Sequence, residues 1–221
     1  MWCIAKGEDA AFVAGMEDIL DLYCLPYDAG CPVVCMDEKP YQLWDEVRAP
    51  IPMEPGKPRK VDSEYIRKGT CSIFVFTEPL TGWAYANARE RRTKLDWAEE
   101  IRWLLEEAYP EAPKIRFVLD NLNTHVISSL YEAFPAPKAR ALAKRLELHY
   151  TPKHGSWLNI AEIQISVLAR QCLCRRLPDI AVLNHDMSAW NDIHSASSKP
   201  VDWQFSTVDA RTKLKYLYPG F

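Results

Sequence analysis

Two aspartates each follow a short apolar run, and a glutamate occupies a candidate helix further along the chain. Asp37 ends the stretch VVCMD, and Asp120 ends IRFVLD. Aspartate is a poor strand residue, and ligands bind at the ends of central strands in open sheets. If the two strands are neighbours, both carboxylates meet at one edge, which Glu162 can also reach. Such converging carboxylates repel one another unless a cation is present, and hard oxygen ligands favour magnesium or manganese.

Two such ions, about 3.5–4 Å apart, activate an attacking oxygen and stabilise the leaving oxygen in phosphodiester displacement. The spacing alone leaves a structural interpretation open. Asp37 and Asp120 could cap helices or turns, and Glu162 could be an exposed helix residue. Because the chain has 30 acidic residues, three of them are easily selected by chance.

The elements that would position these acids follow from hydrophobic periodicity and from turn residues. The predicted elements are a helix over 8–22, a strand over 33–36, a long proline-rich loop over 48–68, a hairpin of strands 71–77 and 83–88, a helix over 93–109 capped by Thr93, a strand over 115–119, two short helices divided near Pro135 and Pro137, a strand over 146–150, a helix over 156–174 capped by Ser156, and two helices around an extended segment 201–205. This order predicts a mixed α/β sheet flanked by helices.

The helix expected over 156–174 has a polar and an apolar stripe. The polar stripe consists of Asn159, Glu162, Ser166 and Arg170. The apolar stripe, which could face the sheet, consists of Ile160, Ile163 and Val167.

Composition and charge restrict the class of protein. With 48% hydrophobic and 26% charged residues, the 221-residue chain has a globular composition. No apolar run approaches the roughly 18 residues of a membrane span, and the opening residues 1–7 lack a signal-peptide pattern, so we expect a soluble cytoplasmic protein. The seven cysteines contain no CxxC pair, which disfavours a zinc site. The net charge of −3 disfavours a stand-alone DNA binder, but cations cluster in residues 57–68, 89–94 and 138–145.

The sequence around the acids resembles a known family. The stretches MDEKP at 36–40, VLDNLNTH at 118–125 and YTPKHGSWLNIAEI at 150–163 closely resemble bacterial transposases of the insertion sequence 630 family, which are relatives of the mariner elements. The resemblance spans nearly the whole chain, including ERRTKLDWA at 90–98 and RQCLCRRLPD at 170–179. It implies a ribonuclease-H-like fold, with a catalytic and metal-binding triad on Asp37, Asp120 and Glu162. It also implies two Mg²⁺ ions, with Mn²⁺ able to substitute.

The resemblance implies a reaction and partners. The chain would hydrolyse a phosphodiester at a transposon end, and the freed 3′-hydroxyl would attack target DNA. A homodimer on DNA, in the bacterial cytoplasm and associated with the nucleoid, would carry this out. Residues 1–30 would form a linker helix, 31–178 the catalytic domain, and 179–221 a helical extension of that domain.

Two features depart from the family. The interval between Asp120 and Glu162 is longer than in mariner relatives, and we assign the excess to residues 135–145 on the outside of the sheet. Family members usually carry helix-turn-helix modules that recognise transposon ends, whereas residues 1–32 alone precede the first predicted strand. We therefore expect that portion to be encoded by a separate or frameshifted reading frame, or to have been lost by truncation.

Further residues are candidates for contact with DNA. They are Lys39, Arg91, Arg92, Asn121, Asn123, Lys153, His154, Ser156 and Trp157. Lys39 follows Asp37 by two and shares its strand face. Amides before a helix N-terminus favour a phosphate, and Trp157 could stack on a base or pack in the core. Thr124 is expected to cap the next helix, and His125 and His154 are alternative general bases that two-metal chemistry does not require.

Two other functions are compatible with the sequence. The chain could be an inactive transposase remnant that binds DNA or a full-length partner. It could also be a ribonuclease-H-like nuclease that performs no strand transfer.

Overall fold

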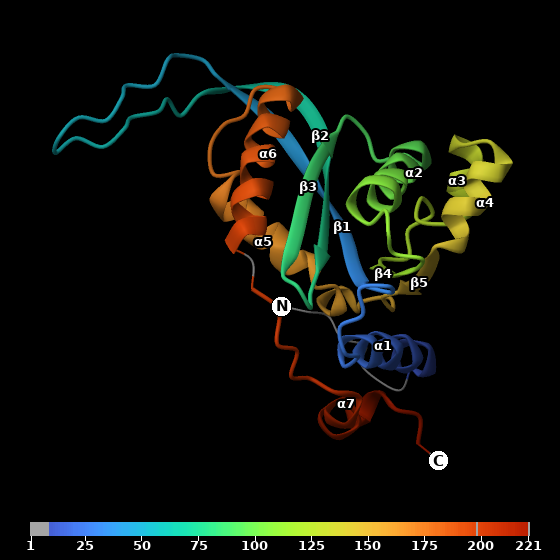
Figure 1. Cartoon of the computed structure of the whole chain (residues 1–221). Helices are drawn as coiled ribbons and strands as arrows, with labels where there is room; N and C mark the ends of the chain where they lie inside the picture. Colours follow the sequence, from blue (N-terminus) through green and yellow to red (C-terminus); the bar gives the residue numbers. More distant parts are fainter. Residues whose placement is uncertain (1–8, 198, 221) are drawn as a thin grey trace.

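A five-stranded mixed sheet forms the centre of the chain in the computed structural model, which describes residues 9–197 and 199–220 (Figure 1). The strands lie in the order β3-β2-β1-β4-β5. Their bounds are β1 Val33–Glu46, β2 Tyr65–Glu78, β3 Trp83–Arg89, β4 Ile115–Leu119 and β5 Leu146–Tyr150. The first three strands are antiparallel neighbours, whereas β4 pairs in parallel with both β1 and β5. The predicted mixed sheet flanked by helices is therefore confirmed.

Helices cover both faces of the sheet. One face carries α2 (Lys94–Trp103), its π-helical continuation Leu104–Ala108, α3 (Ser128–Ala133) and α4 (Ala136–Lys144). The other face carries α1 (Ala10–Tyr23), α5 (Ala161–Gln171), α6 (Ile180–Ser197) and α7 (Thr207–Lys213). Short 3₁₀ turns occupy Ser156–Leu158 and Lys215–Leu217. In the described part of the chain, no helix is long and apolar enough to cross a membrane.

The start of β1 is buried on both faces, which explains its uninterrupted apolar sequence. Val34 and Met36 pack in the cluster that contains α2. Val33 and Cys35 point the other way, into the cluster that contains α1. Strands covered on both sides read as continuous apolar runs.

Most of the predicted elements are confirmed. Thr93 caps α2, accepting a hydrogen bond from the Asp96 amide at 3.3 Å. The hairpin, the strands 115–119 and 146–150, and the helices around residues 135–137 form as expected. The first helix begins at Ala10, and residue 8, where it was expected to begin, lies outside the described residues, as do residues 1–7.

Two predicted boundaries are wrong around the first acid. Asp37 does not end its strand, because β1 continues to Glu46 by pairing with β2. The segment 48–68 is not a simple loop. Residues 47–64 form an arm that projects from the sheet (cyan in Figure 1), closed by bridges between Ile51 and Lys60 and between Glu54 and Lys57. Its four prolines interrupt the ladder, since proline cannot donate to one, and this obscured the arm in the sequence.

The expected helix caps at Ser156 and Thr124 are also wrong. Ser156 opens a three-residue 3₁₀ turn without a side-chain cap, and α5 begins only at Ala161. The shift changes which residues of α5 are buried. Ile160 is 1% exposed, but Ile163 is 52% exposed. Ile127, not Thr124, precedes α3, and the Thr124 carbonyl accepts from the Ser129 hydroxyl.

Two asparagines of α6 complete the hydrogen bonding of the edge strand β3. Asn184 accepts from the amide of Ala88 at 2.8 Å and donates to its carbonyl at 3.1 Å. Asn191 repeats the pattern on Ala86 at 2.8 and 3.0 Å. The two side-chain amides thus act as a substitute for a further strand, and they block the edge against pairing with another chain.

Replacing both asparagines with alanine should destabilise the chain and expose this edge. Each substitution leaves one amide and one carbonyl of β3 unpaired, which costs about 1–3 kcal/mol per residue. Urea unfolding should show this loss, and sedimentation should show increased self-association. Ser188→Ala, at an exposed position of the same helix, is the control. Equal stability of the double variant and the wild type would contradict the role of the two amides.

Candidate active site

The parallel register of β1 and β4 aligns the first two acids. Cys35 pairs with Val118, which is the last parallel pair of these strands. Asp37 lies two residues further along β1, and Asp120 directly follows the last residue of β4. The pairing stops before them, so both carboxylates stand where the strands cease to be hydrogen-bonded to each other.

Asn159 fixes the start of α5 to β1. Its side-chain amide donates to the Met36 carbonyl at 2.8 Å, and its oxygen accepts from the Ala161 amide at 3.1 Å. Asn159 is 2% exposed, so both bonds are shielded from water. Glu162 is therefore held in the first turn of a helix that is tied to β1 one residue before Asp37. The sequence placed Asn159 on the polar stripe but did not reveal this tie.

A hollow of about 470 Å³ lies between β1 and α5. It is lined by Asp37, Glu38, Lys39, Pro40, Glu162, Ile165, Ser166 and Ala169. The structure thus brings together two of the three predicted acids and Lys39, which was predicted to share the face of Asp37. Asp120 is not among the lining residues.

The carboxyl of Asp37 has a raised pKa. Burial raises the pKa of its carboxyl to about 7, although the Glu38 amide donates to it at 2.8 Å. The negative charges of Asp120 and Glu162 raise this pKa further. The three predicted acids are therefore close enough to act on one another, although they come from three different elements.

A buried histidine joins the second acid to β1. His125 is 1% exposed, and its Nδ1 lies 2.6 Å from Asp120 Oδ1. Its Nε2 lies 3.0 Å from Oε1 of Glu38, a side chain 2% exposed. Burial opposes protonation, but the hydrogen bonds to Asp120 and Glu38 outweigh it and raise the pKa of His125 to about 9.

His125 is accordingly a positively charged bridge near neutral pH. Its ring lies 5.9 Å from that of Trp97, and the Tyr150 hydroxyl donates to its carbonyl at 2.7 Å. Sequence reasoning missed Glu38 as its partner. Strand alternation was the available signal, because Glu38 must point away from Asp37 toward the α2 face, where residues after β4 lie.

The donor chemistry of the site fits a hard divalent cation. The charges of Asp120 at the end of β4 and of Glu162 on α5 raise the pKa of Asp37 on β1, and a cation would relieve this repulsion. In the described residues, no three side chains of histidine, cysteine, aspartate or glutamate are arranged to hold one ion together. Asp120 is instead directed at His125. Collecting all three acids around an ion would require side-chain rotation.

The predicted DNA contacts around Asp120 divide into two groups. Arg92 lines a hollow of about 280 Å³ with Asn121 and Asn123, which gathers three predicted residues beside the second acid. Arg91 lies instead in a different hollow with Lys68 and Asp179. Arg91 and Arg92 therefore line different hollows, although they are adjacent in the sequence.

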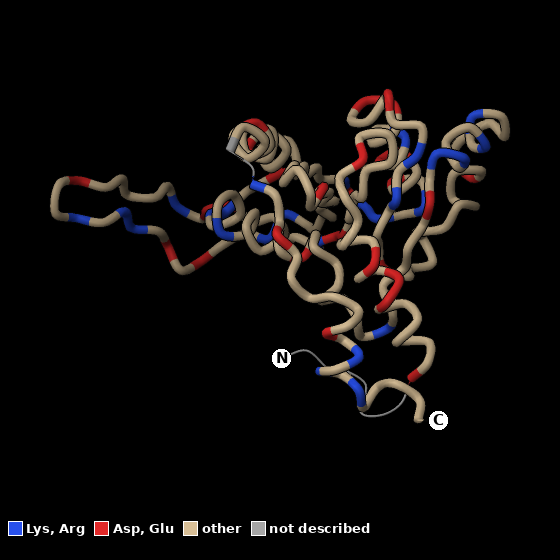
Figure 2. Tube along the Cα trace, turned by 60° about the horizontal axis from the view of Figure 1, so that its bottom comes forward, with Lys and Arg blue, Asp and Glu red and all other residues tan. Residues whose placement is uncertain are grey.

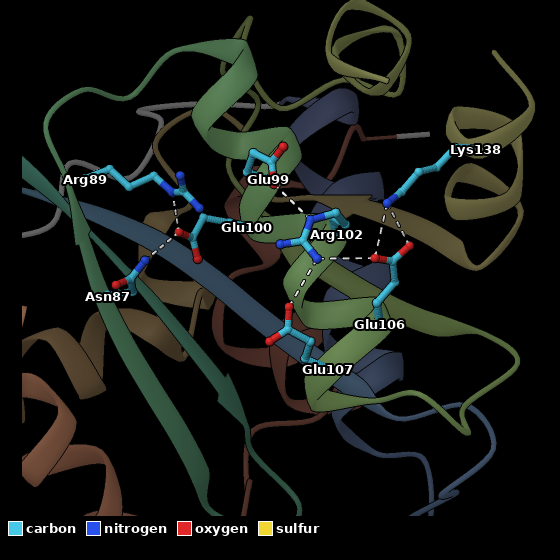
Figure 3. A network of polar contacts seen from close by, with 8 residues as sticks. All are labelled: Asn87, Arg89, Glu99, Glu100, Arg102, Glu106, Glu107 and Lys138. Atoms are coloured by element: carbon cyan, nitrogen blue, oxygen red, sulfur yellow. Dashed lines mark hydrogen bonds and ion pairs between the residues drawn. The ribbon is translucent and has the colours of Figure 1, made fainter. Parts of the chain in front are cut away.

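Two of the four cations in the basic cluster at 89–94 form ion pairs within the protein, and Figure 3 shows the pair of Arg89 with Glu100. Arg89 Nε lies 2.5 Å from Oε1 of Glu100, which is 1% exposed and also accepts from Asn87. Lys94 pairs with Glu132 at 2.6 Å. Arg91 and Arg92 are the exposed members of the cluster with no ion pair to another described residue.

The segment 153–157 forms a tight turn on the surface. His154 has a φ of +66°, a left-handed conformation that is uncommon for residues other than glycine. Lys153, His154 and Ser156 are exposed. Trp157 packs against the α1 cluster, with its ring 6.1 Å from that of Phe205. This core contact accounts for Trp157 without a nucleic acid.

The comparison with protein families decides the class of the chain. A family model described as DDE superfamily endonuclease matches residues 32–184, more than half of the chain. The chain belongs to the DDE superfamily endonucleases. This match includes Asp37, Asp120 and Glu162. A comparison with curated protein sequences gives no match.

Three solved structures with a similar fold are complexes of mariner Mos1. The mariner Mos1 paired end complex with Mg matches at a TM-score of 0.56 and 14% identity, covering 100% of this chain and 66% of that chain. The paired end complex with Mn matches at 0.54 and 13%, covering 90% and 60%. The Mos1 strand transfer complex matches at 0.53 and 12%, covering 90% and 59%.

These likenesses show that the fold is ribonuclease-H-like, as expected from the sequence. The chain spans 59–66% of the length of the Mos1 chains it matches.

The raised pKa of Asp37 gives a testable dependence of stability on pH. The carboxyl titrates at about 7 in the folded chain and at about 3.9 when unfolded. Between these values the folded chain binds more protons than the unfolded chain, so the free energy of unfolding falls as pH rises.

We expect Asp37→Asn to be more stable than the wild type at about pH 8, by up to about 4 kcal/mol, and similar to it near pH 4. Urea unfolding without divalent metal measures this difference. Asp202→Asn, an exposed position, should show no such dependence. A stability difference for Asp37→Asn that is constant across the pH range would contradict the assignment.

Proposed function

We propose that this chain is the catalytic domain of a transposase that cleaves DNA at transposon ends and joins the freed 3′ ends to target DNA. The observation that carries the proposal is the electrostatic coupling of Asp37 with Asp120 and Glu162 at one edge of a ribonuclease-H-like sheet. We assign the catalytic domain to residues 31–178, with 1–30 as a linker helix and 179–221 as an extension. The sequence motifs favour the insertion sequence 630 family of bacteria.

Asp37, Asp120 and Glu162 would hold two Mg²⁺ ions, with Mn²⁺ able to substitute. When bound, these ions would activate the attacking oxygen and stabilise the leaving oxygen of the phosphodiester. The neighbouring residues keep the acids in place. Asn159 ties α5 to β1, and His125 restrains the Asp120 carboxylate.

The scissile DNA strand would cross the edge between Lys39 and Arg92. Lys39 shares the hollow of Asp37 and Glu162, and Arg92 shares that of Asn121 and Asn123. One cation would therefore stand on each side of the acids, where each could contact a backbone phosphate. Lys153 and His154 form an exposed turn that could contact a further phosphate.

Transposon ends must be brought together, so we propose that the chain acts as a homodimer on DNA. Recognition of the end sequence would come from a helix-turn-helix portion, which could be separately encoded. The net charge of −3 supports an arrangement in which this domain catalyses the reaction and the helix-turn-helix portion provides most of the DNA affinity.

The direct test is Mg²⁺-dependent cleavage of a duplex that carries the transposon end. Asp120→Asn should lower the cleavage rate at least about a hundredfold, because it removes a carboxylate ligand of the ions that would stabilise the charge developing in the transition state. Asp202→Asn, an exposed acid that lines neither hollow of the site, should cleave like the wild type. Equal cleavage by Asp120→Asn and the wild type would show that the metal-site assignment is wrong.

Strand transfer separates a transposase from a simple nuclease. Duplexes with pre-cleaved 3′-hydroxyl ends should be joined to a target plasmid when Mg²⁺ is present. Cleavage without any joined product would instead indicate a nuclease. Absence of both activities, with the end-recognition portion supplied, would indicate an inactive remnant.

A further inference from the structure

β1 and the chain of α5 and residues 172–176 lie side by side along a line that we call the seam. A second hollow follows the active-site hollow along this seam. The active-site hollow is lined by residues 37–40 of β1 and by Glu162 to Ala169 of α5. The second hollow, of about 460 Å³, lies at the root of the arm. It is lined by Tyr41, Trp44, Glu46, Arg59, Val61, Tyr65, Leu173, Cys174, Arg175 and Arg176. On both sides of the seam, its residues follow those of the active-site hollow in the sequence.

The seam has a defined direction and length. From Asp37 to Trp44, β1 rises about 23 Å at roughly 3.3 Å per residue. The chain leaving α5 returns beside this stretch, where the Tyr41 hydroxyl donates to the Arg175 carbonyl at 3.3 Å. A strand of DNA lying along the seam would therefore reach the second hollow a few nucleotides away from the acids.

Aromatic rings form the inner part of this hollow, which we call the root pocket. Trp44 and Tyr65 meet edge to face, with ring centroids 4.2 Å apart. Arginine planes cover them, since Arg67 lies 5.8 Å from the Trp44 ring and Arg176 lies 5.8 Å from the Tyr65 ring. Tyr65 nevertheless remains 45% exposed. Such rings stack on the face of a nucleobase.

The charge of the root pocket favours an anion. Arg176 pairs with Glu46, and Arg175 pairs with Asp186. Arg59, on the returning half of the arm, is exposed and has no hydrogen bond or ion pair to another residue in the described ranges 9–197 and 199–220. Figure 2 shows cations and acids interspersed along the arm. The arm as a whole therefore has no uniform positive charge, and we expect a phosphate to be attracted by the pocket rather than by the whole arm. Arg59 is thus available for a phosphate.

We propose that the root pocket binds an unpaired nucleotide of the DNA strand that runs along the seam from the active site. Aromatic contact needs a free base face, and stacking covers these faces within a duplex. Tyr65 would stack on the base, and Arg59 would contact the phosphate. The inference rests on the proposed function, because it takes DNA as the substrate of the acids.

The first test measures binding without catalysis. A fluorescein-labelled oligothymidylate of 15 nucleotides and a duplex of equal length would be titrated with the full chain in EDTA, and binding followed by anisotropy. Loss of one base–aromatic contact should weaken single-strand binding about tenfold in Tyr65→Leu. Arg59→Ala should weaken it severalfold, and both variants should bind the duplex within about twofold of the wild type.

Arg140→Ala removes an exposed arginine of α4 and is the matched control for charge. Circular dichroism would verify that each variant is folded. Arg59 makes no hydrogen bond or ion pair with another described residue, so its variant remains informative even if Tyr65→Leu disturbs the root of the arm. Single-strand affinity that is unchanged in Arg59→Ala, or lowered equally in Arg140→Ala, would overturn the inference.

The second test locates the base. An oligonucleotide containing 5-iododeoxyuridine should give a photo-adduct on Tyr65 or Trp44 in peptide mass maps. Adducts confined to other residues would overturn the inference. The wild type would be assayed in parallel for Mg²⁺-dependent cleavage. If the wild type cleaves DNA but the pocket variants bind single strands as the wild type does, the root pocket is refuted and the proposed function stands. Adducts at Tyr65 without any cleavage refute the proposed function instead.

Discussion

The short parallel pairing of β1 with β4 determines where the acids of the site can stand. Val33 to Cys35 pair with Arg116 to Val118, and both strands are buried on two faces. Parallel strands in register bring equivalent residues to the same edge. Asp37 and Asp120 follow the last pair by two residues each, so this register brings the two acids to the same end of the paired strands.

The rest of the site depends on this alignment. Asn159 reaches the Met36 carbonyl beside Asp37 and thereby sets the start of α5 and the position of Glu162. On the opposite face, Glu38 holds His125, which in turn holds Asp120. The two residues that flank Asp37 on β1, Met36 and Glu38, thus help to position the two other acids. The repulsion among the acids makes the site costly when Asp37 is ionised, which is typical of a site that binds a cation.

The sequence predicted the strands well because they have local signals. Apolar runs such as 115–119 and 146–150 mark buried strands, and the motifs around Asp37, Asp120 and Glu162 are continuous in the sequence. The misplaced features depend on distant contacts. β1 extends past Asp37 because β2 pairs with it. The start of α5 at Ala161 depends on Asn159, whose side chain is hydrogen-bonded to the distant Met36 carbonyl of β1. The partnership of His125 with Glu38 joins residues far apart in the sequence, so periodicity gives no indication of it.

The central claim is that Asp37, Asp120 and Glu162 form one metal site. Anomalous diffraction from crystals grown with Mn²⁺ tests it most directly. The account predicts difference peaks at the edge of the sheet within coordination distance of Asp37 and of at least one of Asp120 and Glu162, with the Asp120 carboxylate reoriented. Saturating Mn²⁺ that gives no peak at this edge, or peaks bound by other residues, would contradict it.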